Sequence, residues 1–328
     1  MLNGDYSENK SPDNNTQTIT SDMIKGLYLA KKSPFKYKGG IINKEIKHGF
    51  GVIYYENSVD KYIGNFYNNK SNGICRFIND NTEFTGEYID SLPYGYGIFK
   101  SFITIKDKQY TTTTEGVWCN NVISGIAIET INDSITYEGT YVDNKKEGIG
   151  FYKWQDGTTY QGEWKDDMIN GVGVIYYKDG SKYEGEVKDG YMHGYGEYTF
   201  KDGTKYIGEY VNGIKEGFGT FVWDYKNFSI YSGMWHKGKM NGIGMKISND
   251  VKKYGVWKDG KKEKWLNGQR AVKKWMNKKI NGEVDENEEE SKNSSEKKEI
   301  KYDGWILKKM YDFMRKDLKK IKKFVLKK

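Results

Sequence analysis

Residues 183–205 have the sequence YEGEVKDGYMHGYGEYTFKDGTK. The same pattern begins again at Tyr206, and the two preceding copies begin at Tyr160 and Tyr137, a spacing of 23 residues. A pattern that returns at a fixed period indicates an array of similar supersecondary units stacked along the chain. The repeat therefore decides the fold class before any local property does.

Each copy has the features of one β-hairpin. Tyr183, Gly185 and Val187 alternate, so they share one face of an extended strand. Asp189 and Gly190 follow where the chain must reverse, and glycine supplies the positive φ of a tight turn. A second alternating stretch, residues 194–200, predicts the returning strand.

Glycine inside a strand needs a physical reason, because it costs roughly 0.5–1 kcal/mol relative to alanine. The usual reason is the close approach of another group to the backbone. The chain has 28 Tyr and 9 Trp residues, so we expect an aromatic ring to lie flat over each strand glycine. Such rings can supply much of the core.

The glycine of the first strand recurs ten times along the chain, which predicts nine full hairpins and a terminal half unit. The tenth unit is taken as half present because Lys264 stands where the next glycine is expected. Residues 100–113 interrupt the period and predict an elongated hairpin arm. The ten glycines are Gly39, Gly64, Gly86, Gly116, Gly139, Gly162, Gly185, Gly208, Gly233 and Gly255.

Composition divides the 328 residues into five segments. We expect a disordered polar arm at 1–33, the repeat sheet at 34–265 and a short capping helix at 266–280. An acidic low-complexity linker follows at 281–300, and a basic helix at 301–328. The N-terminus lacks the apolar region of a secretory signal, and no apolar run reaches the length of a membrane span. We therefore expect an intracellular, cytoplasmic protein.

The C-terminal segment predicts a basic amphipathic helix. Its apolar residues are three or four positions apart, which places them on one helix face, and its basic residues fall mostly elsewhere. Such a helix suits an anionic membrane, a partner protein or its own sheet, and these alternatives stay open. The helix residues are Leu307, Met310, Met314, Leu318, Ile321 and Val325 with Lys308, Arg315, Lys316, Lys319, Lys322 and Lys323.

Patterns that could support catalysis or cofactor binding are weak. The Gly-x-Gly pairs lack the third glycine and following helix of a nucleotide-binding loop. Neither the three His residues nor Cys75 and Cys119 have ligand spacing, so no metal site is expected. The recurring acids Glu87, Glu163, Glu186 and Glu209 alternate away from the ring face, which favours a solvated surface. We predict no catalytic, cofactor or metal residues.

The pattern Tyr-x-Gly-Glu-Trp/Tyr followed by Gly-x-Gly resembles the MORN repeat (membrane occupation and recognition nexus) over about residues 37–264. Departures are Thr114 and Lys253 in the aromatic positions and Cys75 and Ala127 in the last glycine position. The resemblance implies an all-β repeat protein: an elongated, twisted, single-layer antiparallel sheet of consecutive hairpins, curved into a groove lined by aromatic residues. It also implies cytoskeletal or membrane association and self-association through end repeats.

These observations predict a non-enzymatic scaffold or adaptor that binds a helix or extended peptide along the aromatic groove, with the basic tail as a tether to membrane or cytoskeleton. The alternatives are a phospholipid-binding module and a regulator, in trans, of a lipid-signalling enzyme. We do not expect nucleic acid as a partner, because the aromatic rings should be buried by packing and therefore unable to stack on bases. We do expect a homodimer. The predicted groove residues are Tyr137, Tyr141, Tyr160, Trp164, Tyr183, Tyr206, Tyr210, Tyr231 and Trp235.

Overall fold

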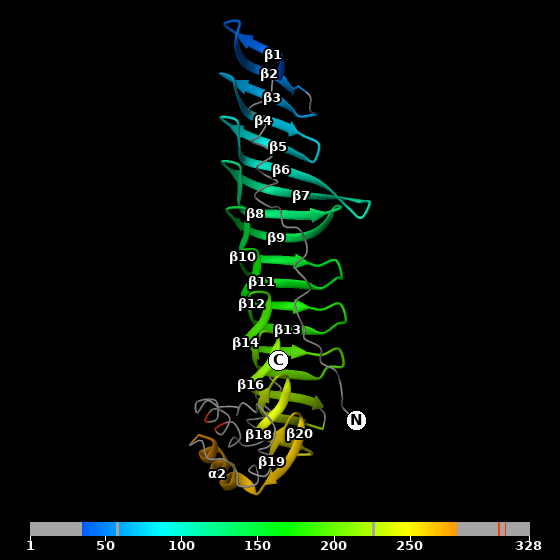
Figure 1. The fold of residues 1–328 in the computed structure, drawn as a ribbon, viewed down its shortest axis with the longest axis vertical. Coiled ribbons are helices and arrows are strands. Elements are labelled where there is room, and N and C mark those ends of the chain that lie inside the picture. Colours follow the sequence, from blue (N-terminus) through cyan, green and yellow to red (C-terminus); the bar gives the residue numbers. More distant parts are fainter. Residues whose placement is uncertain (1–34, 57–58, 225–226, 281–307, 309–311, 313–328) are drawn as a thin grey trace, which may run out of the picture. The chain divides into compact units, whose positions relative to one another are not determined.

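A computed structural model describes residues 35–56, 59–224, 227–280, 308 and 312. Twenty strands form an open antiparallel sheet in which successive strands are joined as hairpins, and a helix follows the last strand (Figure 1). The predicted all-β repeat fold is confirmed. The strands belong to two compact units, an N-terminal unit with β1–β12 and a C-terminal unit with β13–β20 and α2.

The N-terminal unit contains six hairpins. Their strands are β1 (Phe35–Ile42), β2 (Ile46–Tyr55), β3 (Lys61–Tyr67), β4 (Lys70–Ile78), β5 (Thr82–Ile89), β6 (Leu92–Ile105), β7 (Lys108–Cys119), β8 (Val122–Ile131), β9 (Ser134–Val142), β10 (Lys145–Lys153), β11 (Thr159–Lys165) and β12 (Met168–Tyr176).

The C-terminal unit contains four hairpins and the helix. Its elements are β13 (Lys182–Lys188), β14 (Tyr191–Thr199), β15 (Lys205–Val211), β16 (Ile214–Asp224), β17 (Ser229–His236), β18 (Lys239–Ser248), β19 (Val251–Lys258), β20 (Lys261–Leu266) and α2 (Gly268–Ile280). The second strand β20 completes the tenth hairpin, which the sequence had suggested was only half present. Trp265 lies opposite Gly255 in this hairpin, where most other hairpins have a second glycine.

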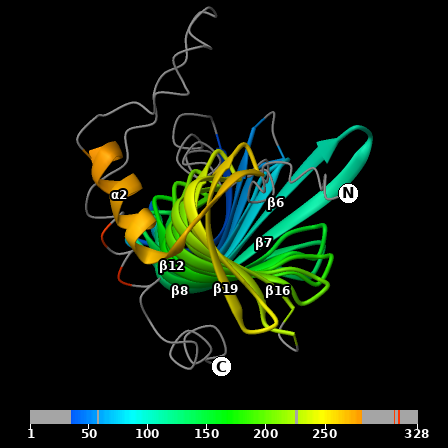
Figure 2. The ribbon, with the colours of Figure 1, turned by 90° about the horizontal axis from the view of Figure 1, so that it is seen from below.

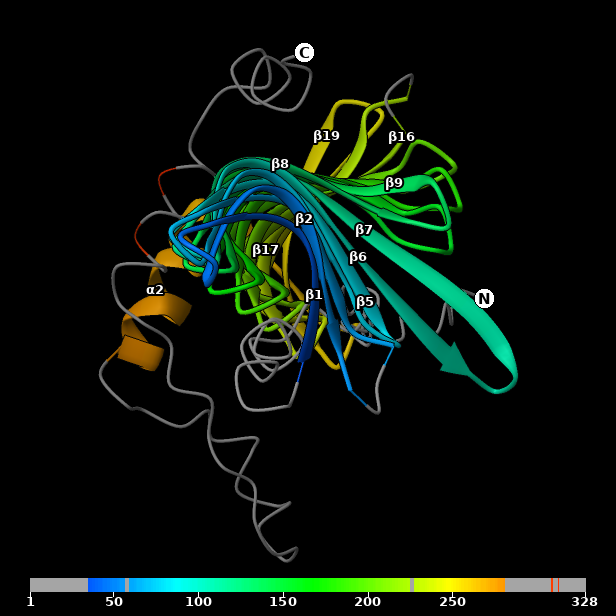
Figure 3. The same ribbon diagram turned by 90° about the horizontal axis from the view of Figure 1, so that it is seen from above.

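The insertion at residues 100–113 forms the predicted arm. Strands β6 and β7 pair without interruption from Gly95 opposite Trp118 to Ile105 opposite Lys108. Figures 2 and 3 show these two strands extending beyond their neighbours in the N-terminal unit.

In most hairpins the aromatic ring at the start of the first strand lies over a pair of facing glycines, as the sequence predicts. Gly162 and Gly173 are opposite each other in β11 and β12, and a Cβ built on Gly173 would lie 2.3 Å from Cε2 of Tyr160. The Tyr160 hydroxyl donates to the carbonyl of Glu163 at 2.8 Å, where a register shift interrupts the strand pairing. The ring therefore excludes any side chain larger than glycine, and its hydroxyl satisfies a backbone acceptor that the ladder leaves unpaired.

The hairpin turns connect each hairpin to the one before it. Asn68 and Asn69 both have positive φ, as a two-residue type I′ turn requires. The backbone amide of Asn69 donates to the carbonyl of Lys47 at 3.0 Å, and its side-chain oxygen accepts from the Lys47 amide at 2.9 Å. Asp167 makes the same two contacts with Lys146. Asn and Asp at this position therefore fix the spacing of successive hairpins.

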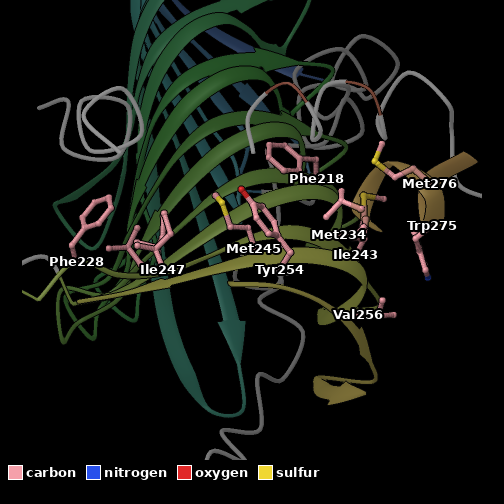
Figure 4. Packing of buried hydrophobic residues seen from close by; sticks show 13 residues of the cluster. Phe218, Phe228, Met234, Ile243, Met245, Ile247, Tyr254, Val256, Trp275 and Met276 are labelled. Carbon is pink, nitrogen blue, oxygen red and sulfur yellow. The ribbon is translucent and has the colours of Figure 1, made fainter. Parts of the chain in front are cut away.

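The C-terminal unit has a second apolar core on the face opposite its rings. Side chains of β16–β19 form it together with Val272, Trp275 and Met276 of α2 (Figure 4). The helix packs against β19 and β20 (Figures 1 and 2). Strands β16–β19 are thus packed on both faces.

Candidate functional site

The aromatic residues predicted to contact a partner are buried. Tyr137, Tyr160, Tyr183, Tyr206 and Tyr231 are 0 % exposed, and the other predicted groove residues, Tyr141, Trp164, Tyr210 and Trp235, are at most 6 % exposed. Neighbouring rings meet edge to face within each unit, for example Tyr137 with Trp164 at 5.3 Å and Tyr206 with Trp235 at 5.0 Å. They contact one another, backbone glycines and the side chains of Lys146 and Lys215. Binding of a partner by them stays a prediction.

The acids of the first strands lie on the opposite face. Glu163 and Glu186 are exposed, and their carboxylates lie against Gly171 and Gly194, both of which have positive φ. The Glu186 carboxylate also accepts from the backbone amide of Tyr195 at 3.0 Å. In the described part of the chain no group of His, Cys, Asp and Glu side chains could hold a metal ion.

This opposite face also carries a series of apolar side chains that the sequence analysis did not single out. They stand between the two glycines of each second strand, so alternation directs them away from the rings. In the N-terminal unit they are exposed, up to 74 % for Ile126 and 61 % for Ile149. We call this set the apolar column; its members are Phe50, Ile74, Tyr96, Ile126, Ile149 and Val172.

The residues between successive members of the apolar column decide how continuous the apolar surface is. Glu87 lies directly opposite Ile74, and Glu163 lies opposite Ile149. Between these two acids, Tyr96 faces Val117, which is also exposed, and Ile126 faces Thr140. Strands β6–β10 therefore present a row of mostly apolar side chains from Tyr96 to Ile149, which Glu115 and Glu138 flank on the same face. Exposed apolar patches mark interaction sites.

The same positions are buried at the end of the C-terminal unit. Phe218 and Ile243 are 7 % and 0 % exposed, and their cross-strand neighbours are the apolar residues Met234 and Val256. Figure 4 shows these side chains on the face toward Trp275 and Met276 of α2. A helix of this chain therefore takes part in covering the column where the column is buried.

Two lysines lie among the rings on the ring face. The Lys146 ammonium pairs with Glu129 at 3.3 Å, and both side chains are 5 % exposed. Tyr141 donates to the same Glu129 carboxylate at 3.0 Å. Lys215 occupies the equivalent place in the C-terminal unit, and burial lowers its pKa to about 8. Both lysines replace apolar residues, Ile169 and Met192, of other hairpins.

The surroundings of Cys75 and His236 indicate structural roles for these two residues. Burial raises the pKa of the Cys75 thiol to about 11, which keeps it protonated and unreactive at neutral pH. His236 lies 2.7 Å from Glu216, whose carboxylate also accepts from the Lys237 amide. Cys75 is 2 % exposed and therefore acts as a packing residue.

The predicted tail helix lies outside the described residues, apart from Lys308 and Asp312, which are exposed. Neither the length nor the apolar character of any helix among the described residues suffices to cross a bilayer.

The apolar column had a signal in the sequence. A large apolar or aromatic residue stands between the two glycines, or between a glycine and its replacement, in nine successive hairpins from Phe50 to Ile243. This apolar position did not enter the sequence prediction, because the glycines and tyrosines alone account for the hairpin repeat.

A family model described as the MORN repeat matches six stretches of the chain, at residues 62–81, 137–159, 160–182, 183–205, 206–224 and 231–250. A search of curated proteins gave no match.

Proposed function

This chain belongs to the MORN-repeat family, whose repeats are generally interaction repeats, and we propose that it is a non-enzymatic scaffold that binds an amphipathic helix along the apolar column of its N-terminal unit. The proposal keeps the partner class expected from the sequence and moves the contact surface to the face opposite the rings. The buried rings are then the frame that holds the contact residues at a fixed spacing.

The observation that carries the proposal is the difference in exposure along the Gly-x-Gly positions. Ile126 and Ile149 are exposed, whereas Ile243 is fully buried in a core to which α2 contributes Trp275. Burying an exposed isoleucine side chain is worth roughly 1.5–3 kcal/mol. The N-terminal unit thus leaves uncovered a surface that a helix helps to cover in the C-terminal unit.

The repeat distance of the column fits the repeat distance of a helix. Successive column residues are two strands apart, or roughly 9.6 Å. Seven residues of an α-helix rise about 10.5 Å. A helix that crosses the strands can therefore place one apolar residue of each heptad on each hairpin. Three hairpin steps, from Tyr96 to Val172, amount to roughly 29 Å, which about twenty helical residues span.

The charge beside the column favours a basic helix. Glu115, Glu138 and Glu163 stand on the same face as the column, and each follows or precedes a first-strand glycine. Tyr96 donates to the Glu115 carboxylate, which orients it beside the apolar patch. Basic side chains flanking an apolar stripe would meet these acids, which favours the correct register and speeds association.

A synthetic peptide of residues 301–328 has the required properties and serves as the probe. Its apolar residues Leu307, Met314 and Ile321 are seven apart, and the peptide is rich in lysine. The receptor is the chain ending at residue 300, which keeps every described strand and α2. Fluorescence anisotropy with labelled peptide should give saturable binding that Ile126→Asp with Ile149→Asp weakens at least tenfold.

Two controls separate the column from other exposed apolar positions. Val142→Asp changes an exposed valine at a hairpin end outside the column and should leave binding unchanged. A peptide with Met314→Asp and Ile321→Asp keeps most of the charge and should not bind. Equal binding by the column variant and the wild type would reject the proposal.

A membrane-binding function is the second candidate, and the exposed face of α2 favours it. Arg270, Lys273 and Lys274 are exposed there and line a shallow hollow of about 670 Å³. Such a basic face is attracted to anionic lipid, by about 1 kcal/mol per residue near the surface. The wild-type chain should sediment with phosphatidylserine vesicles, and the fraction that sediments should fall when these three residues are changed to Gln. Neutral vesicles are the control, and a chain ending at residue 300 separates α2 from the tail.

A further inference from the structure

Strand β20 is the last strand of the sheet in the described part of the chain, and one of its edges is open. It pairs only with β19 there, so alternate backbone N–H and C=O groups of Lys261–Leu266 point away from the sheet. Five of its six residues are exposed. The helix α2 packs through Val272, Trp275 and Met276 against the face opposite the rings. The helix therefore covers a face of the sheet, and the edge of β20 can accept another strand.

The last hairpin departs from the repeat on its ring face. Lys253 stands where most hairpins have an aromatic residue. Gly255 is flanked instead by Trp257 and Trp265, each with a ring atom 3.1 Å from a Cβ built on the glycine. The Trp265 ring packs edge to face on Trp257, with ring centres 5.9 Å apart, and Trp265 is 45 % exposed. The ring face therefore ends in an exposed indole at the open edge.

Two ammonium groups lie over this exposed indole. The Nζ atoms of Lys262 in β20 and Lys253 in β19 are 5.2 and 5.8 Å from the centre of the Trp265 ring. Both lysines are exposed, so their ammonium groups are hydrated and can exchange water for a carboxylate. The site combines an apolar ring with two cations, which suits a ligand that carries both aromatic and acidic side chains.

The charge of the two strands indicates which strand can be added. β19 and β20 together contain six Lys and one Glu. Lysines on an edge strand oppose pairing with a second copy of the same edge, because like charges would meet. The same lysines attract a strand that carries carboxylates, since cross-strand pairs of opposite charge stabilise a sheet. Charge therefore favours an acidic occupant.

We propose that the open edge of β20 binds an acidic extended peptide as an additional strand. The backbone of the peptide pairs with that of β20. Alternate residues of a strand share a face, so an aromatic side chain packs on Trp265 while acidic residues two positions away lie near Lys253 and Lys262. The recognised pattern is an aromatic residue flanked at alternate positions by Asp or Glu. This site is separate from the apolar column, and its partner is an extended segment rather than a helix.

The test uses the full-length protein and the labelled synthetic peptide ETFTETE, which has this pattern. Fluorescence anisotropy should show saturable binding, and hydrogen exchange of the β20 amides should slow at least tenfold in the complex, because the added strand pairs with them. Lys253→Gln with Lys262→Gln should weaken binding at least tenfold, and so should Trp265→Thr, which keeps a residue suited to a strand. The matched control, Lys165→Gln with Lys188→Gln, removes two exposed lysines from other hairpins and should leave binding unchanged.

Two further comparisons separate the edge from other sites. Changing Arg270, Lys273 and Lys274 of α2 to Gln should leave peptide binding unchanged, and the peptide KTFTKTK should not bind. The proposal is overturned if ETFTETE does not bind, or if the α2 variant loses binding while the Lys253 and Lys262 variant keeps it. It is also overturned if sedimentation shows a wild-type dimer that the Lys253 and Lys262 variant converts to a monomer, because the edge would then belong to a second copy.

Discussion

The Gly-x-Gly positions of the two units are built from the same repeat and have opposite surroundings. In the N-terminal unit Ile149 is exposed beside Glu163, and in the C-terminal unit Ile243 is buried beside Val256. The backbone register is the same, because in both units one flanking glycine lies opposite a tryptophan and the other opposite a glycine. What differs is the cross-strand neighbour and the nearby helix α2. The repeat therefore fixes where an apolar residue stands, and the neighbours decide whether it is core or contact surface.

The largest expected effect comes from placing a charge in each of these positions. Ile243→Asp should destabilise the last hairpins by about 4 kcal/mol, because it buries an unpaired carboxylate. Ile149→Asp should change stability by no more than about 0.5 kcal/mol, as expected for a surface site. Hydrogen exchange of the β18 and β10 amides reports each hairpin separately. Comparable losses at both positions would break the comparison.

The two equivalent lysines extend the comparison to the ring face. Lys146→Met leaves Glu129 buried without its cation and should cost about 3 kcal/mol. Adding Glu129→Leu should recover most of that loss, because the pair is then replaced by apolar side chains. Chemical denaturation of the two variants measures this coupling. A double variant no more stable than Lys146→Met would argue against the ion pair.

Lys215→Met should act in the opposite direction. The folded pKa of about 8 lies below the ordinary value of about 10.4, so below pH 8 the folded protein must carry a disfavoured ammonium. Removing it should stabilise the protein by about 1–2 kcal/mol at pH 7, after allowance for the ring contacts. The gain should shrink as pH rises from 8 to about 10.4, since unfolding then binds a proton. Thermal unfolding across this pH range checks the sign, and a constant difference would contradict it.

The smallest expected loss of stability comes from removing a tyrosine hydroxyl on the ring face, and it should be equal in the two units. Tyr160→Phe and Tyr183→Phe each remove a hydroxyl that donates to a backbone carbonyl, at 2.8 and 2.6 Å. Each should cost about 1 kcal/mol. Tyr54→Phe, at an exposed tyrosine, is the control and should cost little. Unequal losses would show that the ring faces also differ between the units.

Most of the fold could be predicted because the same hairpin pattern recurs many times in the sequence. The period, the ring over each glycine pair and the arm at residues 100–113 all follow from spacing. The second strand of the tenth hairpin was not expected because Lys264 stands where the period requires a glycine, and the structure places Trp265 opposite Gly255. The tryptophan instead packs edge to face on Trp257, with ring centres 5.9 Å apart, an arrangement that the glycine rule does not describe.

The contact surface was harder to predict than the fold. Glycines and aromatic residues recur in most hairpins because the packing of a ring over the backbone needs both, and this regularity predicted the ring face as the contact surface. The residue between the glycines varies among Phe, Ile, Tyr and Val, since an exposed position requires only apolar character. The pairing of Glu129 with Lys146 also depends on positions 17 residues apart, a distance that no single hairpin pattern reveals.

The central claim is that the apolar column receives a helix in step with the hairpins, and photo-cross-linking tests it most directly. Three 301–328 peptides would carry a diazirine leucine in place of Leu307, Met314 or Ile321, each bound to the chain ending at residue 300. We expect adducts on the column face that move by one hairpin for every seven peptide residues, between Tyr96 and Val172. Adducts on the ring side, or adducts from all three peptides at one hairpin, would contradict the account.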